Sequence, residues 1–377
     1  MPAPVHLDLS ELIANPLRSG IQRVEREAIR HWPGPAPLLP CMVDTNGGLL
    51  ALPESVLTVL GAEDDGTPAA RAAERSALAQ AMAAAKPLPD NQAERLLNLE
   101  LFYRPERAEA YLRLASGSSV LLWYVYDFLP FLLPGLFPPG TTRHCMHFLR
   151  ALRAASRVAF LSERTRQNYT SRVARIPSQL VPGPVLSPGA DGLRLERQTF
   201  TPCRRDFVCI GTVEPRKNTQ ALLDAFQALW DRGSPARLVV AGRIAPEATG
   251  ARDFFARHTD NPRLLVLDQP ADETLRDVLR QARAVVMPSE AEGFGLPPYE
   301  ALHAGIPAIA SAELPSVGLL PAGVRLLRRM DPSSIAEAVE ALLDDAEAAR
   351  LWNEAAGVRL PTWASFGREL GEWAQAA

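Results

Sequence analysis

The chain of 377 residues carries a formal net charge of -3, and 47% of its residues are hydrophobic and 22% charged. This length suits two α/β domains, and the composition is that of an ordinary globular protein rather than a disordered chain. No bulk basic charge favours a nucleic-acid partner. The cysteines contain no C-x-x-C pair, which indicates buried reduced thiols and argues against a disulfide scaffold or a zinc site. They are Cys41, Cys145, Cys203 and Cys209.

The N-terminus lacks a basic segment followed by an apolar one, so no signal peptide is expected and the sequence predicts a cytoplasmic protein. The strongest apolar run, Val120–Phe137, contains Asp127, Pro130 and Pro134. A membrane span needs about 20 predominantly apolar residues, and prolines break helices. We therefore predict a buried strand that leaves through a loop.

The first half of the chain shows apolar runs typical of strands and two helical patterns. The second helical pattern is rich in alanine, a strong helix former. The expected strands are Val5–Leu9, Leu38–Val43, Val120–Val125 and Val158–Leu161, and the expected helices cover 20–31 and 68–85.

The second half alternates short apolar runs with helical patterns. The expected strands are Phe207–Ile210, Leu238–Val240, Leu264–Leu267, Val285–Met287 and Ala308–Ala310, and the expected helices lie near 218–231, 272–282 and 298–304. This alternation of strand and helix predicts βαβ units in a parallel, doubly wound sheet.

A segment rich in proline and glycine, Pro182–Pro202, separates the two halves and marks the domain boundary. The predicted division is a first Rossmann-like domain over 1–185, a linker over 186–202, a second Rossmann-like domain over 203–360, and a helical tail over 361–377 that packs back on the first domain.

The segment Gly211-Thr-Val-Glu-Pro-Arg-Lys-Asn218 follows an expected strand and opens an expected helix, with Asn218 as a favourable N-cap residue. Such a turn points free backbone N–H groups and the positive helix end at one place, which suits an anion. Arg216 and Lys217 add two positive charges there; arginine grips a phosphate in a bidentate manner, and lysine acts as a point charge. The alternative is a solvated turn with exposed basic residues.

The segment Pro288-Ser-Glu-Ala-Glu-Gly-Phe-Gly-Leu-Pro-Pro-Tyr-Glu300 also follows an expected strand. Gly293 and Gly295 allow unusual backbone angles and a close approach of a ligand, and ligands bind at this edge of open α/β sheets. Glu292 lies in the loop. Glu300, eight positions later, lies near the first turn of a helix, where its carboxylate suits two ribose hydroxyl groups. The alternative is a glycine-rich turn with a glutamate favoured by the helix dipole.

Together the two segments resemble glycosyltransferase family 4, in which two Rossmann-like domains face each other across a cleft (the GT-B architecture). The family patterns E-P-R-K-N and E-x7-E appear here as Glu214–Asn218 and as Glu292 with Glu300. The resemblance covers nearly all of residues 205–345 well and the N-terminal half weakly. It implies transfer of a sugar from a nucleotide diphosphate with retention of anomeric configuration.

The resemblance also implies roles for single residues. Arg216 and Lys217, in the turn that begins at Gly211, are implied to bind the donor diphosphate, and Glu300 the ribose. The residues implied to lie near the transferred sugar are Glu292, Gly293, Phe294, Gly295 and Leu296.

In the first half, Arg18-Ser-Gly-Ile-Gln-Arg-Val24 is similar to an element of bacterial surface-polysaccharide members of the family. Gly20 would let the diphosphate approach the helix that begins there, whereas Arg23 is either a second contact or a solvated helix residue. Tyr126 and Asp127 follow a strand where many family members carry His-Asp, so the family's histidine contact to the sugar is not carried over. Asp127 is either a contact to the acceptor or donor sugar or a turn-capping aspartate.

No metal ion or other cofactor is expected, because the histidines show no metal-ligand spacing and no D-x-D sequence occurs. Arg216, Lys217 and the helix ends then have to stabilise the leaving diphosphate. A further basic set is expected on one helix, as a solvated face or as a face that meets anionic lipid or a lipid-linked phosphate. Its members are Arg143, His144, His147, Arg150, Arg153 and Arg157.

The sequence thus predicts a retaining, metal-independent glycosyltransferase of bacterial surface polysaccharide synthesis, such as that of lipopolysaccharide. Its expected partners are a nucleotide-diphosphate sugar, a glycan or lipid-linked acceptor and, weakly, the inner face of the cytoplasmic membrane. Two other functions fit the same architecture. A nucleotide-sugar epimerase is disfavoured by the E-P-R-K-N and E-x7-E patterns, and a non-catalytic nucleotide-sugar-binding partner is kept open by the replacement at Tyr126.

Overall fold

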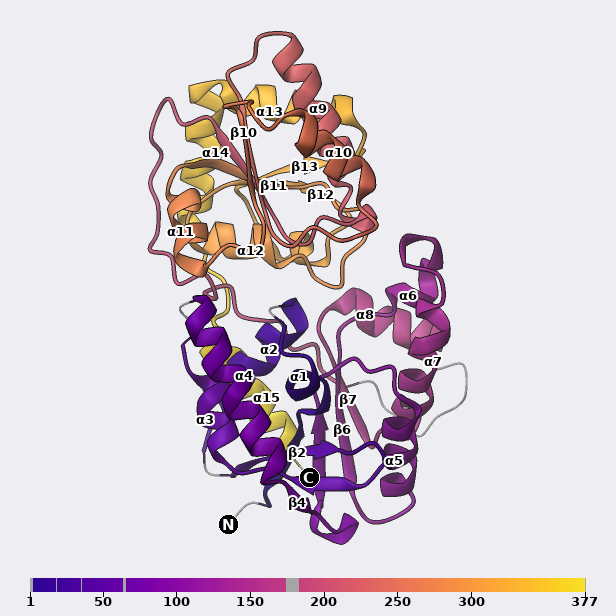
Figure 1. Cartoon of the computed structure of the whole chain (residues 1–377). Coiled ribbons are helices and arrows are strands. Elements are labelled where there is room, and N and C mark those ends of the chain that lie inside the picture. The colour runs from indigo at the N-terminus through magenta and orange to yellow at the C-terminus, as the bar shows by residue number, and fades with distance from the viewer. Residues whose placement is uncertain (1–2, 18, 35, 64–65, 174–182, 377) are drawn as a thin grey trace. The chain divides into compact units, whose positions relative to one another are not determined.

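The computed structural model describes residues 3–17, 19–34, 36–63, 66–173 and 183–376 (Figure 1). Arg18 and Pro182, named above, lie outside these residues. The chain divides into two compact units. The first unit consists of Met1–Gly189 together with Pro361–Ala377, and the second of Ala190–Leu360.

Within the described residues, the first unit forms a seven-stranded sheet with the order β4-β3-β2-β1-β5-β6-β7. Its strands are β1 (Val5–Asp8), β2 (Leu38–Val43), β3 (Leu49–Ala51), β4 (Lys86–Pro87), β5 (Arg95–Asn98), β6 (Val120–Val125) and β7 (Arg157–Phe160). The neighbouring pairs β2–β1, β1–β5, β5–β6 and β6–β7 are parallel, as predicted. The pairs β2–β3 and β3–β4, at one edge of the sheet, are antiparallel. This edge adds antiparallel strands to the predicted parallel sheet, because a short turn between β2 and β3 allows only a hairpin.

Helices cover both faces of the first sheet (Figure 1). They are α1 (Ser10–Ala14), α2 (Gly20–Arg30), α3 (Ser55–Gly61), α4 (Pro68–Ala83), α5 (Pro105–Ala115), α6 (Leu129–Leu132), α7 (Thr141–Leu152), α8 (Glu163–Asn168) and α15 (Trp363–Gln375), with short turns η1 (Asp90–Gln92), η2 (Pro134–Leu136) and η3 (Tyr169–Val173). On one face, Tyr111 of α5 and Phe148 of α7 pack against Trp123 of β6. On the other, Phe366 of α15 meets Tyr124 of β6 edge-on. Neighbouring residues of β6 thus serve opposite faces, as strand geometry requires.

Helix α15 packs on the end of α2 through a close backbone approach. A Cβ added at Gly367 would lie 2.4 Å from the carbonyl oxygen of His31, and one added at Gly371 would lie 2.4 Å from Cγ of Pro33. No side chain tolerates contacts of this length, so two glycines one turn apart make the packing possible. The tail of the chain is therefore fitted closely to the first unit.

The second unit, all of which lies in the described part of the chain, forms a six-stranded sheet with the order β10-β9-β8-β11-β12-β13. Its strands are β8 (Asp206–Ile210), β9 (Arg237–Ala241), β10 (Leu264–Leu267), β11 (Ala282–Met287), β12 (Ala308–Ser311) and β13 (Val324–Leu327). All neighbouring pairs are parallel. The five strands and the parallel sheet predicted for this half are confirmed, and β13 is added at the edge.

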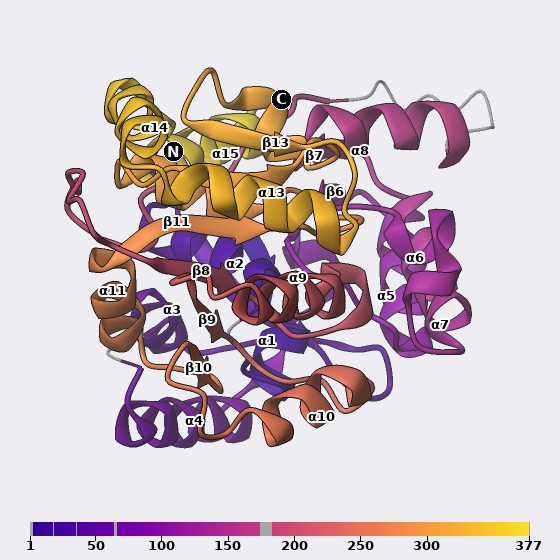
Figure 2. The same cartoon turned by 90° about the horizontal axis from the view of Figure 1, so that it is seen from above.

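The helices of the second unit cover both faces of its sheet, as a doubly wound fold requires. They are α9 (Thr219–Asp231), α10 (Thr249–Arg257), α11 (Asp272–Arg280), α12 (Leu296–His303), α13 (Pro332–Leu343) and α14 (Asp345–Gly357), with turns η4 (Pro215–Lys217) and η5 (Pro315–Leu319). Figure 2 shows α9 and α13 side by side. Val240 of β9 joins the core under α9 and α13, whereas its neighbour Val239 joins the core under α11 and α14.

The segment predicted as a linker, 186–202, packs largely on the second unit, which begins at Ala190. Leu193 and Leu195 are buried in a core of that unit. The backbone N–H of Gln198 donates to Ala304 O at 2.7 Å. Apolar side chains inside this proline- and glycine-rich stretch explain why most of it is folded rather than free.

The basic helix predicted over 143–157 is shorter than expected. Helix α7 ends at Leu152, Arg153 is its C-cap residue, and Arg157 is the first residue of β7. Among the described residues, no helix is both long enough and apolar enough to cross a membrane. In the run Val120–Phe137 the predicted strand is β6, and the segment predicted as a loop contains α6 and η2.

Candidate active site

The turn after β8 lies directly at the end of β9. Gly211 has a φ of +134°, and its N–H donates to Ala241 O, in the last residue of β9, at 2.9 Å. A Cβ added at Gly242 would lie 2.1 Å from Gly211 O. Because only glycine fits such a contact, these residues bring two strand ends together at the edge where ligands of parallel sheets bind.

The structure corrects the role predicted for Asn218. This residue stands at the N-cap position of α9 but has a left-handed conformation, with φ 55°, and its side chain makes no capping hydrogen bond. Its Nδ2 donates instead to Met330 O at 2.7 Å and to Pro288 O at 3.3 Å. Asparagine suits this position because it enters the left-handed region more readily than most residues. Asn218 therefore joins the turn after β8 to the segments that follow β11 and β13.

Arg216 and Lys217 converge on Glu292, which lies in the loop after β11. Nη1 of Arg216 donates to Glu292 Oε2 at 2.8 Å, and Nζ of Lys217 lies 2.5 Å from Glu292 Oε1. Nη2 of Arg216 donates to Glu214 Oε1 at 2.6 Å, and Nη1 also donates to Ala291 O at 2.8 Å. The residues predicted for the diphosphate and for the sugar thus form one cluster.

This cluster is shielded from solvent and nearly neutral. The side chain of Glu292 is 9% exposed, that of Lys217 16% and that of Arg216 17%. Burial disfavours the charged form of Glu292, but the positive charges of Lys217 and Arg216 outweigh burial and hold the pKa of this carboxyl below its usual value. Glu292 is therefore ionised at neutral pH. Any anion that binds Arg216 and Lys217 has to take these two cations from the carboxylate or share them with it.

The glycine-rich loop after β11 is fixed by Ser316 of η5. Gly295 has a φ of +95°, and a Cβ there would lie 2.9 Å from Ser316 Oγ. Ser316 Oγ donates to Gly295 O at 2.8 Å, and its N–H donates to Phe294 O at 2.9 Å. Leu296 then begins α12, with Pro297 in its first turn, as predicted. The loop, which includes Gly293, is thus held at the start of a helix.

Glu300 occupies a different setting from Glu292. It lies in the middle of α12 and is only 4% exposed. Helix α12 packs against β11 and β12. The two glutamates of the E-x7-E pattern therefore stand on consecutive elements, one in the loop beside the basic pair and one inside the helix.

The site residues predicted in the first half all lie in the first unit. Gly20 begins α2, where Ser19 is the N-cap and its Oγ accepts from Gln22 N at 3.3 Å. The hydroxyl of Tyr126 is buried and donates to Leu99 O at 2.7 Å. Asp127 Oδ1 accepts from Leu129 N at 2.9 Å, which is the turn-capping contact considered above.

Sequence reasoning assigned no role to Glu214 or Ser316. Glu214 stands inside the E-P-R-K-N segment, and an acid two residues before Arg216 was a usable signal for an ion pair. Ser316 is distant in sequence from the glycine-rich loop that it fixes, and no local pattern marks it.

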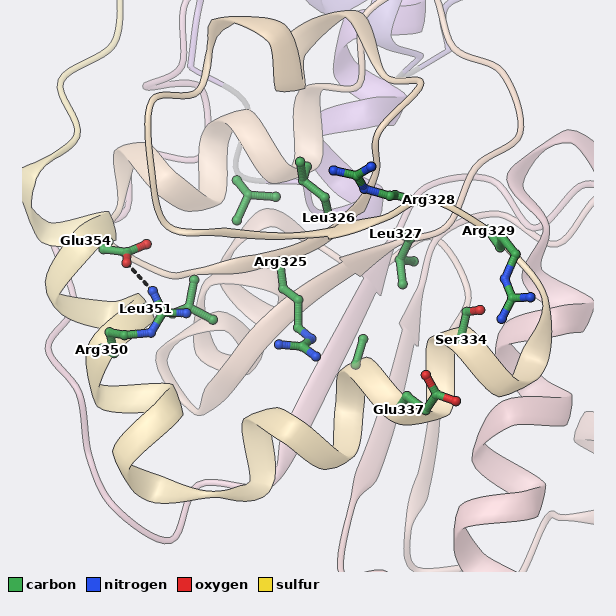
Figure 3. A pocket seen from close by; sticks show the side chains of 12 residues that line it. Arg325, Leu326, Leu327, Arg328, Arg329, Ser334, Glu337, Arg350, Leu351 and Glu354 are labelled. Carbon is green, nitrogen blue, oxygen red and sulfur yellow. Dashed lines mark hydrogen bonds and ion pairs between the residues drawn. The ribbon is translucent and has the colours of Figure 1, made fainter.

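A hollow of about 520 Å³ lies elsewhere in the second unit, between β13, α13 and α14 (Figure 3). Three of its arginines pair with acids: Arg325 with Glu347 at 3.5 Å, Arg329 with Asp331 at 3.4 Å, and Arg350 with Glu354. These ion pairs reduce the excess of positive charge in the hollow. None of the described residues that line it is a predicted site residue.

The described residues contain no group of three or more His, Cys, Asp or Glu side chains placed to hold a metal ion. Independence from metal remains a prediction about the reaction. Within the described residues, the positive charges of the cluster are those of Arg216 and Lys217.

Residues 196–359 match the family model described as glycosyl transferases group 1. The matched segment contains the whole basic cluster and both glutamates of the E-x7-E pattern. The second unit is a group 1 glycosyl transferase domain. The resemblance predicted from the two motifs is thereby confirmed.

Relatives of this group 1 domain include enzymes of known activity. The chain is 34% identical over 104 residues to the serotype-specific mannosyltransferase WbdA of Escherichia coli. The matched segment covers 27% of this chain and 13% of WbdA. It is also 37% identical over 111 residues to the O-antigen chain mannosyltransferase B of Escherichia coli, and this match covers 29% of each chain. The chain thus spans less than a third of the length of these two relatives.

The fold of the whole chain, group 1 domain and first unit together, resembles that of solved structures. Alr3699/HepE of Anabaena, in complex with UDP-glucose, matches with a TM-score of 0.68 at 15% identity, covering 99% of each chain. At this identity the likeness shows the fold alone. It confirms the predicted class of two Rossmann-like α/β domains.

Proposed function

We propose that this protein is a retaining glycosyltransferase that moves a sugar from a nucleotide diphosphate to a glycan or lipid-linked acceptor in bacterial surface polysaccharide synthesis. The observation that carries the proposal is the convergence of Arg216, Lys217 and Glu292 at the carboxyl edge of the sheet in a group 1 domain. The O-antigen mannosyltransferases among the relatives support a surface polysaccharide as the product.

Arg216 and Lys217 are proposed to bind the donor diphosphate. When the bond between the sugar and the diphosphate breaks, negative charge grows on the leaving phosphate. Two cations that are already fixed in a shielded site stabilise this charge without reorganisation. Glu214 and Glu292 hold Arg216 in place before the donor arrives.

The remaining donor contacts are proposed for the loop and helix after β11. The carboxylate of Glu300 binds the ribose hydroxyl groups, and Glu292 with the backbone of Gly293–Leu296 lies at the transferred sugar. Gly20 at the start of α2 and Asp127 after β6 are proposed contacts of the first unit to the donor or acceptor. No divalent metal takes part in this scheme.

The first unit is also proposed to make a weak contact with the inner face of the cytoplasmic membrane. Helix α7 carries the exposed residues Arg143, His144 and Arg150 next to Met146, whose side chain is 53% exposed. Helix α6, which packs on α7, is followed by Leu133, 41% exposed. Basic side chains beside exposed apolar ones suit an anionic lipid surface.

A non-catalytic nucleotide-sugar-binding partner is the second candidate, and one observation favours it. The hydroxyl of Tyr126 already donates to a backbone carbonyl inside the unit, so it offers no proton to a sugar in place of the family's histidine. Product analysis with a labelled donor separates the two functions: transfer yields a new glycoside, whereas a binding partner returns the donor unchanged.

The test of the proposed function is Lys217→Ala in an assay of sugar transfer. Losing a charge-assisted contact to the leaving group is expected to cost roughly 2–4 kcal/mol of transition-state stabilisation, a 30- to 1,000-fold loss in rate. Lys86→Ala is the matched control, because Lys86 is the other lysine of the chain and lies exposed in β4 of the first unit. Equal rates for the wild type and Lys217→Ala would refute the assignment.

A further inference from the structure

A cluster of ionisable side chains is buried in the first unit, apart from the site described above. Its members come from different elements: Asp8 ends β1, Glu25 lies on α2, Glu100 follows β5, and Arg107 lies on α5. Each is at most 1% exposed. Three carboxyl groups therefore share one guanidinium group in the interior.

The carboxyl group of Asp8 receives hydrogen-bond donors on both oxygens. Its Oδ1 accepts from Ser10 N at 3.0 Å and from Ser10 Oγ at 2.5 Å. Its Oδ2 accepts from Arg107 Nε at 2.8 Å and from the hydroxyl of Tyr111 at 2.7 Å. A buried carboxylate with this many donors is stable in its ionised form.

Glu100 also receives donors on both oxygens. It accepts from Glu11 N at 3.0 Å and from Leu12 N at 2.7 Å, in the first turn of α1, and it pairs with Arg107. Glu100 therefore holds the start of α1, while its neighbour Leu99 accepts from Tyr126.

Glu25 has no comparable set of donors. Both of its carboxyl oxygens are buried without a hydrogen-bond donor among the described residues. Its carboxyl lies within hydrogen-bonding reach of Glu100, so a proton on Glu25 would bridge the two groups. Burying a third unpaired negative charge here is strongly unfavourable, and holding a proton avoids it.

We propose that Glu25 carries one proton at neutral pH and donates it in a hydrogen bond to the Glu100 carboxylate. This hydrogen bond fixes α2 to the segment that holds α1. Loss of the proton at alkaline pH loosens α2. The hydrogen bond joins the second turn of α2 to the residue that caps α1. When the proton leaves, two negative charges face each other beside Asp8, and the single guanidinium of Arg107 cannot compensate for all three carboxylates.

The direction of the titration follows from the surroundings. Burial raises the pKa of Glu25 well above its usual value, and the negative charge of Glu100 raises it further, while Arg107 lowers it. Burial likewise raises the pKa of Glu100 to about 7, against the opposing charge of Arg107. Of the two, Glu25 holds the proton, because Glu100 already accepts from Arg107 and two backbone N–H groups.

The other ionisable groups that face the pair supply no second positive charge. Burial raises the pKa of Tyr126, Tyr111 and Cys41 well above their ordinary values, so these groups stay neutral. Glu11, 3.8 Å from Arg107, is a further carboxyl group. A carboxyl group whose pKa is higher in the folded chain than in the unfolded chain stabilises the fold. This contribution is complete below the pKa of the unfolded chain, and it is lost as pH rises toward the higher pKa of the folded chain.

The test follows hydrogen exchange of the α2 amides, Gly20–Arg30, in the full-length chain from pH 5 to 9, corrected for the intrinsic exchange rate. Protection in the wild type is expected to fall by up to about tenfold per pH unit, the limit for release of one proton. Glu25→Gln keeps a donor toward Glu100 and cannot ionise, so most of this fall in protection should be absent from the variant. Glu27→Gln is the matched control on the same helix: Glu27 pairs with Arg30 at 2.5 Å and with His31 at 3.4 Å, so this variant should keep the fall in protection that Glu25→Gln loses.

Infrared spectroscopy provides a second readout. The wild type at neutral pH should show the carbonyl stretch of one buried protonated carboxylic acid that Glu25→Gln lacks. The proposal is overturned if that band is missing from the wild type, if Glu25→Gln keeps the pH dependence, or if Glu25→Gln fails to fold, since a neutral mimic of the protonated acid must be tolerated. None of these measurements uses a donor or an acceptor sugar, so the outcome is independent of the proposed enzyme function.

Discussion

The basic pair of the second unit is neutralised by carboxylates of the same unit. Lys217 and Arg216 both contact Glu292, and Arg216 also contacts Glu214. Such an arrangement avoids leaving two buried cations without partners in the absence of donor. If these two side chains bind the donor diphosphate, as proposed, Glu292 competes with it for them. The residue proposed to serve the sugar would then influence binding of the nucleotide as well.

Glu292→Gln is expected to tighten binding of a nucleoside diphosphate that lacks the sugar. Removing one charge-assisted competitor should contribute about 1–2 kcal/mol, a roughly 5- to 30-fold lower Kd, measured by calorimetry. Turnover should fall in the same variant, because Glu292 is proposed to lie at the sugar. Glu290→Gln, an exposed glutamate of the same loop, is the control. Weaker nucleotide binding in Glu292→Gln would contradict the competition and would give Glu292 a direct role in holding the nucleotide.

At the scale of elements, strands with a continuous apolar run were predictable, and the short strands at one edge of the first sheet were not. The run Val120–Val125 was placed with the bounds that β6 has, because a buried parallel strand between helices is a continuous apolar run. In contrast, β4 is the exposed pair Lys86–Pro87, and β3 is three residues long. Both strands are too short to show an alternating pattern of apolar and polar residues in the sequence.

The candidate site shows a similar division between local and distant information. The motifs named Arg216, Lys217 and Glu292 because each lies beside a glycine-rich or proline-containing turn that is visible in the sequence. They did not reveal that Asn218 donates to Met330, since these residues are more than a hundred positions apart and no local pattern joins them. Propensity placed Asn218 at the start of the helix, and a distant carbonyl determined its role.

The contact between α15 and α2 leads to a prediction about stability. Replacing Gly367 or Gly371 by alanine inserts a methyl group where the nearest atom of α2 or its extension lies 2.4 Å away. Overpacking of this kind is expected to cost about 1–3 kcal/mol, measured as a lower free energy of unfolding of the first unit. Gly357→Ala is the control, because a Cβ there meets no atom within 4 Å and alanine favours helices. Equal stability of all three variants would show that α15 does not need this close approach.

At the scale of the whole molecule, the proposed chemistry predicts activity without divalent metal. Arg216 and Lys217 would supply the positive charge that a metal ion supplies in other transferases. Transfer in excess EDTA, after removal of any carried-over metal, should therefore proceed at the rate seen with added Mg²⁺. Loss of activity that Mg²⁺ or Mn²⁺ restores would show that the basic pair is insufficient for the leaving diphosphate.

Attachment to a membrane is the other property of the whole molecule that the proposal predicts. The exposed basic residues of α7, with Met146 and Leu133 beside them, form the proposed contact. Each basic residue near an anionic surface contributes about 1 kcal/mol. Two or three of them give a weak attachment that salt screens, because the Debye length shrinks as ionic strength rises. The full chain should therefore sediment with anionic vesicles at low salt and be released at high salt, and it should not sediment with neutral vesicles.

A charge-reversed pair separates this surface from a general effect of charge. Arg143→Glu with Arg153→Glu should abolish sedimentation with anionic vesicles, because both residues are exposed at α7. Arg328→Glu with Arg329→Glu changes the net charge by the same amount on the second unit, where both side chains are also exposed, and should leave sedimentation unchanged. If the two pairs weaken binding equally, the attraction is an unspecific property of net charge. If the wild type shows no preference for anionic vesicles and is fully active on a free soluble sugar, the acceptor is a small soluble molecule and the membrane contact is refuted.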